Sequence, residues 1–309
     1  MNKIDTISHR VLPSKKDRHI LFGSVEPGPK TKPVVKEDMA DLQNTEKDFL
    51  FDIKEVGISN VKYPIVIDSA IKPVNQSTIG NFKMTAQVDR TSKGTNMSRF
   101  LEQIEQSNQD GFRVDFSSLL HFSDSLKQRL EQEQVTVDIS FPWFYERTGP
   151  STEKVGLNHA EAAIKVHYID TDEYTFHGSL TAYITTLCPC SKEISEYSAH
   201  SQRGKVTMEV QFTDDFNDHE SDWKEALLYA AESNASAMIH PVLKRPDEKH
   251  VTETAYENPR FVEDIVRLVA ADLYDLPFIK KFKVTCENEE SIHLHDAIAA
   301  IEFDKEIDR

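Results

Sequence analysis

The richest chemistry in the chain lies between residues 185 and 203. Two of its three cysteines, Cys188 and Cys190, flank a proline there, and His200 follows after a polar loop. Residues two apart point to the same side of an extended segment, and thiolates with an imidazole suit zinc or a similar transition metal. The pattern favours a metal site, although the spacing also fits inert thiols beside a solvated loop.

Three further groups in the second half carry reactive side chains. Glu248 lies in a polar loop over residues 246–250, as a metal ligand or a solvated carboxylate. Glu263 stands near the start of a helix, where a carboxylate can accept from two adjacent N–H donors such as the guanine N1/N2 edge, or simply sit at the surface. His293 and His295 share one face of a predicted strand, as proton shuttles or as surface residues.

Basic side chains surround a glycine-containing loop over residues 89–96 in the first half. They can hold phosphate oxygens by charge-assisted hydrogen bonds, in some cases across a subunit boundary; the alternative is ordinary surface cations. The chain has no P-loop and no dinucleotide-binding glycine fingerprint, which argues against conventional kinases and dehydrogenases. The candidates for phosphate binding are Arg90, Lys93, Arg99, Lys192 and Arg203.

Composition and charge limit the remaining possibilities. The 309 residues include 36 Lys and Arg against 52 Asp and Glu, a formal net charge of −16. Such a surface argues against a general nucleic-acid or anionic-membrane partner, but not against one anionic small molecule. With no long apolar segment, no apolar signal core at the N-terminus and only three cysteines, we expect a cytoplasmic protein with reduced thiols.

Periodicity predicts strands, two helices and strands, in that order and twice over. Residues 1–48 are expected to form a poorly ordered arm, and residues 146–156 have the composition of a linker. The predicted strands are 51–61, 63–71, 77–88, 135–145, 158–168, 174–187, 205–212, 282–286 and 291–303. The predicted helices are 97–106, 117–132, 222–239 and 259–276. This order indicates an α+β fold in which helix pairs cover antiparallel sheets, whose open edges an oligomeric ring or barrel would hide.

Four segments together resemble the type IB GTP cyclohydrolase family. They are residues 187–207, 90–100, 252–264 and 291–302. The resemblance implies two tandem T-fold (tunnelling-fold) units, over 49–148 and 149–309, that assemble into a barrel-like homotetramer with active sites between subunits. It also implies hydrolytic opening of the GTP imidazole ring, giving formate and 7,8-dihydroneopterin triphosphate, the first step towards tetrahydrofolate.

The resemblance also implies roles for individual residues. Cys188 and His200 would form the metal centre with zinc or manganese, iron being a further candidate, and either Glu248 or Cys190 would complete the ligand set. Glu263 would anchor the guanine. His293 and His295 would line the pocket.

Two other functions remain open at this point, because a fold does not dictate a function. One is a non-catalytic, metal-dependent nucleotide-binding or assembly protein. The other is a different tunnelling-fold enzyme that acts on a purine or a pterin.

Overall fold

The computed structural model describes residues 12–43, 45–108 and 111–308 of a chain that divides into two compact units, before and after residue 43. The first unit contains α1 (Lys15–Leu21), whose first turn is capped by the Ser14 hydroxyl, and a short 3-10 helix, η1 (Lys36–Asp38). Its described side chains are all exposed, so it has no core of its own. The predicted arm over residues 1–48 covers this unit; residues 1–11 lie outside the described part.

The second unit is built on one large sheet. Nine strands of its described residues pair in the order β3-β1-β2-β4-β5-β6-β7-β8-β9, and every neighbouring pair is antiparallel except β1 and β3. The strands are β1 (Ile53–Asp68), β2 (Asn75–Val88), β3 (Phe112–Arg113), β4 (Val135–Thr148), β5 (Val155–Asp170), β6 (Glu173–Leu187), β7 (Ser201–Phe212), β8 (Ile279–Glu289) and β9 (Ala297–Asp304).

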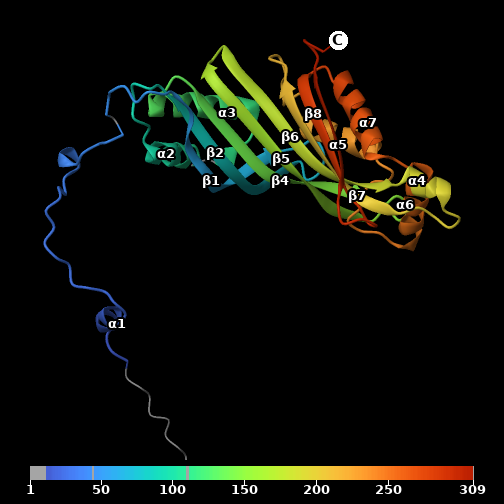
Figure 1. Ribbon diagram of the computed structural model, residues 1–309, viewed down its shortest axis with the longest axis horizontal. Helices are drawn as coiled ribbons and strands as arrows, with labels where there is room; N and C mark the ends of the chain where they lie inside the picture. Colours follow the sequence, from blue (N-terminus) through green and yellow to red (C-terminus); the bar gives the residue numbers. More distant parts are fainter. Residues whose placement is uncertain (1–11, 44, 109–110, 309) are drawn as a thin grey trace, which may run out of the picture. The chain divides into compact units, whose positions relative to one another are not determined.

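Helices follow β2, β3, β6 and β7 in the chain. Figure 1 shows α2 and α3 along one half of the sheet and α5 and α7 along the other, while α4 and α6 lie beyond one end of the strands. The helices of this unit are α2 (Met97–Ser107), α3 (Phe116–Leu130), α4 (Pro189–Ile194), α5 (Trp223–Ser233), α6 (Arg245–Glu257) and α7 (Val262–Asp275).

One hydrophobic core joins the helices to one face of the sheet. Successive strand residues alternate between this face and the other, so that in β4 Val137 and Ile139 are buried while Asp138 between them is half-buried. The opposing helices contribute Phe100 from α2 and Leu126 from α3, both fully buried in the same cluster. The strand and helix periodicities read from the sequence thus correspond to the two sides of one packed layer.

Two predictions about chain breaks are wrong. The strands predicted at 51–61 and 63–71 are one strand, because β1 keeps pairing with β2 on both sides of a bulge at Asn60, a residue with φ of 58°. The linker predicted at 146–156 is a hairpin, in which Thr148 pairs with Val155 and the Gly149 N–H donates to the Lys154 carbonyl (2.8 Å). The sheet is continuous through this hairpin, and the division into T-fold units at residue 148 stays a prediction.

The helix-free face of the sheet carries a polar row that crosses six strands. Register places in this row Lys83, Asp138, Lys165, His177, Gln211 and Lys281. Burial, and secondarily the charge of Lys165, lower the pKa of His177 and of His167 beside it. Both imidazoles are therefore held in the neutral form more strongly than in the unfolded chain.

Stability should depend on these histidines at mildly acidic pH. Below a pH of about 6.5 the unfolded chain binds protons that the folded chain takes up less readily, so the free energy of unfolding should fall as the pH falls. In His177→Gln this fall should be shallower than in the parent, as measured by urea unfolding at a series of pH values. Ser179→Ala, on the same face, should keep the parent's slope, and an equal slope in all three proteins would contradict the prediction.

Candidate functional site

Cys188 lies directly beyond the end of β6, where it caps α4. Its Sγ accepts a hydrogen bond from the Ser191 backbone N–H (3.5 Å), and Pro189 opens the helix. In an extended segment Cys188 and Cys190 would point to the same side. The chain instead turns helical at Pro189, so that Cys188 is half-buried and Cys190 is exposed.

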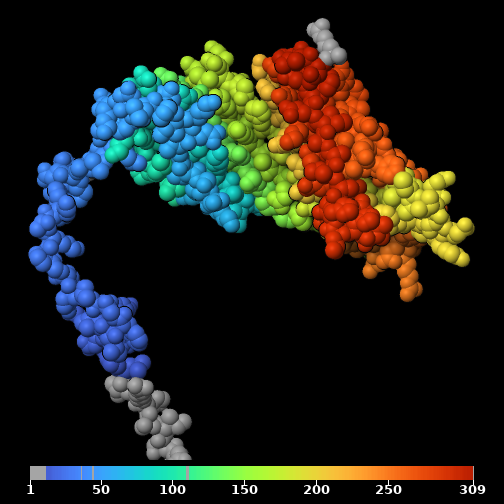
Figure 2. Space-filling view, viewed as in Figure 1, coloured from blue at the N-terminus to red at the C-terminus, as the bar shows by residue number. Residues whose placement is uncertain are grey.

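The loop from residue 188 to residue 200 closes on itself and brings His200 back to Cys188. The Cys188 N–H donates to the His200 carbonyl (3.1 Å). The Ser191 hydroxyl donates to the Cys188 carbonyl (3.2 Å) and accepts from the His200 N–H (3.2 Å). The loop around α4 projects from the surface in Figure 2, next to α6. The backbone thus places a thiol and an imidazole at one point at the end of the sheet.

The orientation of the His200 ring is set by neighbours that the sequence did not single out. Its Nδ1 lies 3.1 Å from the Gln202 amide oxygen, 3.5 Å from the Ser291 hydroxyl and 3.9 Å from a Glu290 carboxylate oxygen. An amide oxygen only accepts, so Nδ1 carries the proton and Nε2 keeps its lone pair. Gln202 lies at the start of β7, two residues after His200, a spacing that could have revealed it from the sequence. Glu290 is adjacent to His200 only through the pairing of β7 with β8.

The end of β6 is itself held by the segment after α5. The Thr185 carbonyl accepts from the Ser236 N–H (3.0 Å), and the Thr185 N–H donates to the Ala237 carbonyl (3.1 Å). The Leu187 N–H donates to the Ser236 hydroxyl (3.0 Å). These bonds explain why α5 ends at Ser233, whereas the sequence predicted a helix to residue 239. The chain leaves the helix in order to pair with the strand.

Glu248 lies in α6, not in the predicted loop. Pro246 fits the start of a helix, and Asp247 at the third helical position accepts from the Lys244 N–H (2.9 Å). Glu248 is exposed, one turn before Val251, which packs against the cluster of Leu187 and Ala255. Residues three apart lie on one helical face, so Glu248 is on the face of α6 that turns towards the end of β6.

Glu263 lies in the first turn of α7 and is exposed. The sequence placed the start of this helix at Asn258 and Pro259; instead Asn258 ends α6 and Phe261 precedes α7. Between them Arg260, which the sequence reading missed, donates its N–H to the Leu187 carbonyl (3.0 Å) and its Nε to the Asn234 carbonyl (3.3 Å). Glu263 and Cys188 are therefore attached to the same strand end.

The two histidines of the β8–β9 connection lie in a loop, because β9 begins only at Ala297. The predicted strand over 291–303 is wrong in its first part. His293 and His295 are exposed, and their rings stack with centroids 4.9 Å apart and an interplanar angle of 13°. The loop begins beside His200, at Ser291, so it adds two imidazoles to the same end of the sheet.

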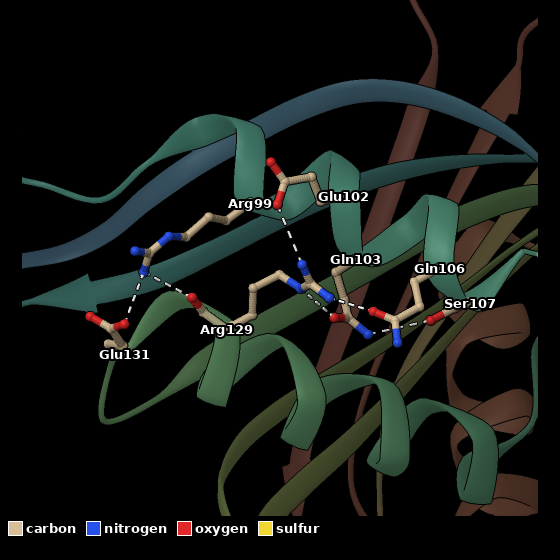
Figure 3. A network of polar contacts seen from close by, with 7 residues as sticks. All are labelled: Arg99, Glu102, Gln103, Gln106, Ser107, Arg129 and Glu131. Atoms are coloured by element: carbon tan, nitrogen blue, oxygen red, sulfur yellow. Dashed lines mark hydrogen bonds and ion pairs between the residues drawn. The ribbon is translucent and has the colours of Figure 1, made fainter. Parts of the chain in front are cut away.

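The first-half cations lie elsewhere. Arg90 and Lys93 are exposed, and Arg99 is half-buried on the wall of a cavity of about 750 Å³. Figure 3 shows that the Arg99 guanidinium is held at the end of α3, by the Arg129 carbonyl (2.9 Å) and Glu131 (3.6 Å). In Figure 1, α2 and α4 lie at opposite ends of the second unit. One chain therefore does not bring these cations to Cys188.

Lys192 and Arg203 lie closer to Cys188. The Lys192 ammonium donates to the Tyr256 carbonyl at the end of α6 and lies 4.3 Å from the centre of the Tyr256 ring. Arg203, on β7, pairs in register with Thr185 of β6. Lys192 thus ties the loop around α4 to α6.

The donor types at the end of β6 are those of a transition-metal site. Cys188 offers a half-buried thiol and His200 a ring nitrogen with a free lone pair, both compatible with a borderline metal ion. Within the described residues, however, no three His, Cys, Asp or Glu side chains come close enough together to hold an ion.

The described residues also include no helix long and apolar enough to cross a membrane.

Residues 39–299 match the family described as Type I GTP cyclohydrolase folE2. The chain belongs to this family. It is similar to the GTP cyclohydrolase FolE2 of Oceanobacillus iheyensis, with 58% identity over 294 residues that cover 95% of this chain and 97% of the relative. It is also similar to the GTP cyclohydrolase FolE2 of Bacillus subtilis, with 52% identity over 301 residues, 97% of this chain and 99% of that one.

A solved structure supports the fold class. The uricase of Arthrobacter globiformis matches with a TM-score of 0.52 over 85% of this chain and 97% of its own, at 11% identity. At that identity the likeness concerns the fold alone. It confirms the predicted α+β class with tandem T-folds, and the FolE2 family membership confirms the resemblance drawn from the four sequence segments.

The tautomer of His200 can be tested directly. At alkaline pH the neutral ring should carry its proton on Nδ1, since Gln202 accepts there; ¹⁵N NMR of histidine-labelled protein distinguishes the two ring nitrogens. Gln202→Leu removes the acceptor and should give a mixture of tautomers, whereas Gln211→Leu on the helix-free face should not. A parent spectrum with the proton on Nε2 would refute this arrangement.

Proposed function

We propose that this FolE2-family enzyme hydrolyses GTP at the imidazole ring of guanine and releases formate and 7,8-dihydroneopterin triphosphate, the first step towards tetrahydrofolate, in the cytoplasm. The observation that carries the proposal is the end of β6. There the Cys188 N–H donates a hydrogen bond to the His200 carbonyl. The backbone N–H of Arg260, which precedes the helix of Glu263, donates to the Leu187 carbonyl. A nucleophile-activating group and an acceptor for a base are thus attached to the same few residues.

We propose that a divalent ion, zinc or manganese with iron as a further candidate, is held by Cys188, His200 and Glu248. The donor chemistry supports this, because a thiolate, an imidazole and a carboxylate together suit these ions. The exposed Glu248 lies on the side of α6 that turns towards Cys188. When bound, such an ion supplies Lewis-acid chemistry and makes a water molecule a better nucleophile near neutral pH.

The chain's own residues then have distinct tasks in this scheme. The Glu263 carboxylate accepts from the N1–H and the exocyclic amine of guanine and orients the base. His293 or His295, or His200 in the version of the scheme in which it does not bind the ion, gives a proton to N7, which makes C8 more electrophilic. One water adds to C8 and the C8–N9 bond breaks to leave a formamide, which a second water hydrolyses to formate and a free amine. The ribose then rearranges and its carbonyl condenses with that amine, so that one water is lost as the pterin ring closes.

We propose further that the triphosphate is bound by cations of a second copy. Arg90 and Lys93 lie in the loop after β2 and Arg99 lies in α2, at the opposite end of the second unit from α4, so within one chain they do not reach the same ligand as Cys188. A homotetramer of tandem T-fold subunits, with divisions at residues 49–148 and 149–309, would bring the two ends together. Lys192, beside Cys188, would add a cation from the catalytic copy once it leaves Tyr256.

Replacing the thiol tests the catalytic assignment. Cys188→Ala should abolish formate release from GTP, and with it pterin fluorescence after oxidation, because the proposed ion loses its thiolate ligand. The fold should be retained, since Cys188 is half-buried and, among the residues that the structure describes, its Sγ makes a single weak hydrogen bond. Tyr197→Phe, in the same loop, should behave as the parent; formate release at the parent's rate by Cys188→Ala would overturn the scheme.

Mixing two inactive variants tests whether sites are shared between copies. Arg90→Ala with Lys93→Ala removes two exposed cations, and Cys188→Ala removes the thiol; each protein alone should be inactive. If one site takes its thiol from one copy and its cations from another, random mixed assemblies should regain about a quarter of the parent's activity. An inactive mixture whose mixed assembly is verified by mass spectrometry would place each site within one chain. Full activity of the Arg90→Ala, Lys93→Ala protein alone would instead remove these cations from the site.

A further inference from the structure

The start of α6 is fastened to the β4–β5 hairpin by one buried carboxylate. Asp247 is fully buried and accepts hydrogen bonds from the Ser151 N–H (2.8 Å), the Thr152 N–H (2.9 Å), the Thr152 hydroxyl and the Lys244 N–H (2.9 Å). Gly149 leaves room for it, since a Cβ there would lie 3.1 Å from Asp247 Oδ1. Four donors converge on one side chain.

This arrangement is more than a helix cap. The bond from the Lys244 N–H caps α6 locally, because the side chain at the third helical position accepts from the backbone of the N-cap residue. The other three come from Ser151 and Thr152, about 95 residues earlier in the chain, in the turn between β4 and β5. Asp247 therefore links the start of α6 to the sheet by hydrogen bonds.

The same hydrogen bonds favour the ionised form of the Asp247 carboxyl group. Burial opposes ionisation, but the Thr152 hydroxyl and the three backbone N–H groups outweigh it and hold the pKa of Asp247 well below its usual value. The carboxylate accepts from all four donors only in its ionised form. An amide of the same shape would turn its NH₂ group towards a donor.

The helix is held at its other end by the strand that leads to Cys188. Ala255 and Val251 of α6 pack with Leu187 and Ala237, the latter bridged to Thr185. Glu248 lies between the two attachments, and its side chain is exposed. Its direction is therefore set by the helix backbone, and the backbone is set by Asp247 on one side and by the small residues on the other.

We propose that Asp247 is a positioning residue that aims Glu248 at the metal-binding side chains around Cys188. The inference rests on the proposed function, in which Glu248 is a ligand. Asp247 does not touch the ion or the substrate. It fixes the rotation and height of the first turn of α6 relative to the sheet, on which the ligands Cys188 and His200 are carried.

Binding of Mn²⁺ to the full-length protein, followed by electron paramagnetic resonance of the free ion, measures this effect without turnover. Asp247→Asn should weaken Mn²⁺ binding roughly tenfold, the lower end of the range for residues that orient metal ligands. Hydrogen exchange of the metal-free protein should become faster in residues 149–154 and 245–257. Thr152→Val, which removes one donor and leaves the backbone bonds, should shift both readouts in the same direction by less, and it serves if Asp247→Asn does not fold.

Asp115 provides a matched control in the other helix pair. It is buried at the start of α3, where it accepts from the Ser118 N–H (2.7 Å) and hydroxyl (2.8 Å). Asp115→Asn should destabilise the protein, as Asp247→Asn does, but leave Mn²⁺ affinity unchanged. Loss of affinity in both variants would mean that general destabilisation is responsible and would refute the positioning role.

Glu248→Gln separates failure of this inference from failure of the proposed function. If Glu248→Gln loses Mn²⁺ affinity while Asp247→Asn binds as the parent does, Glu248 is a ligand that Asp247 does not position, and the inference is wrong. If Glu248→Gln itself binds as the parent does, the ligand set in the proposed function is wrong, and Asp247 has nothing to aim.

Discussion

Hydrogen bonds made by the backbone at the end of β6 hold the candidate site together. Thr185 pairs with Ala237, the Leu187 carbonyl accepts from Arg260, and the Cys188 N–H donates to His200. Leu187 in addition donates to the Ser236 hydroxyl. A strand end would otherwise leave these polar groups without partners in a largely buried place, which is costly. The segments that satisfy them are the ones that carry His200 and Glu263.

The polar groups of the β4–β5 hairpin have a comparable role on the neighbouring side. Besides the bonds to Asp247, Arg147 forms an ion pair with the buried Glu232 of α5, and the Tyr145 hydroxyl lies 3.3 Å from the same carboxylate. Burial raises the pKa of Glu232, while the charge of Arg147 opposes that rise. A buried charge is tolerated only with such a partner. The hairpin is thus tied both to α5 and to α6, on either side of the segment that pairs with β6.

The sheet explains why the second unit holds two separated sets of functional candidates. Its strands are long and its helices cover one face, so loops at opposite ends are kept apart by the length of a rigid layer. The loop of Arg90 and Lys93 and the loop of Cys188 therefore keep a fixed separation within a chain. In the FolE2 family arrangement that we propose, assembly of copies, rather than bending of one copy, completes the site.

Local periodicity was sufficient to predict most elements of the second unit. The helices at 97–106 and 117–132 and the strands at 135–145 and 174–187 follow from alternating or helical spacing of apolar residues, because each pattern reflects one buried face. The chemistry of Cys188, His200 and Glu263 was also visible, since their types alone limit what they can bind. Two of the errors lie where a long-range partner decides: α5 ends early because residues 236 and 237 pair with Thr185, and residues 146–156 form a hairpin because their neighbours are paired strands.

What the sequence determined by itself is therefore the alternation of strands and helices and the types of side chain at the end of β6. Only the tertiary structure revealed Glu290 at His200, Arg260 at Leu187 and Asp247 at the hairpin. These side chains have ordinary types at ordinary spacings. Their roles come from donors and acceptors contributed by segments up to about a hundred residues away, and sheet register rather than local sequence decides which of them meet.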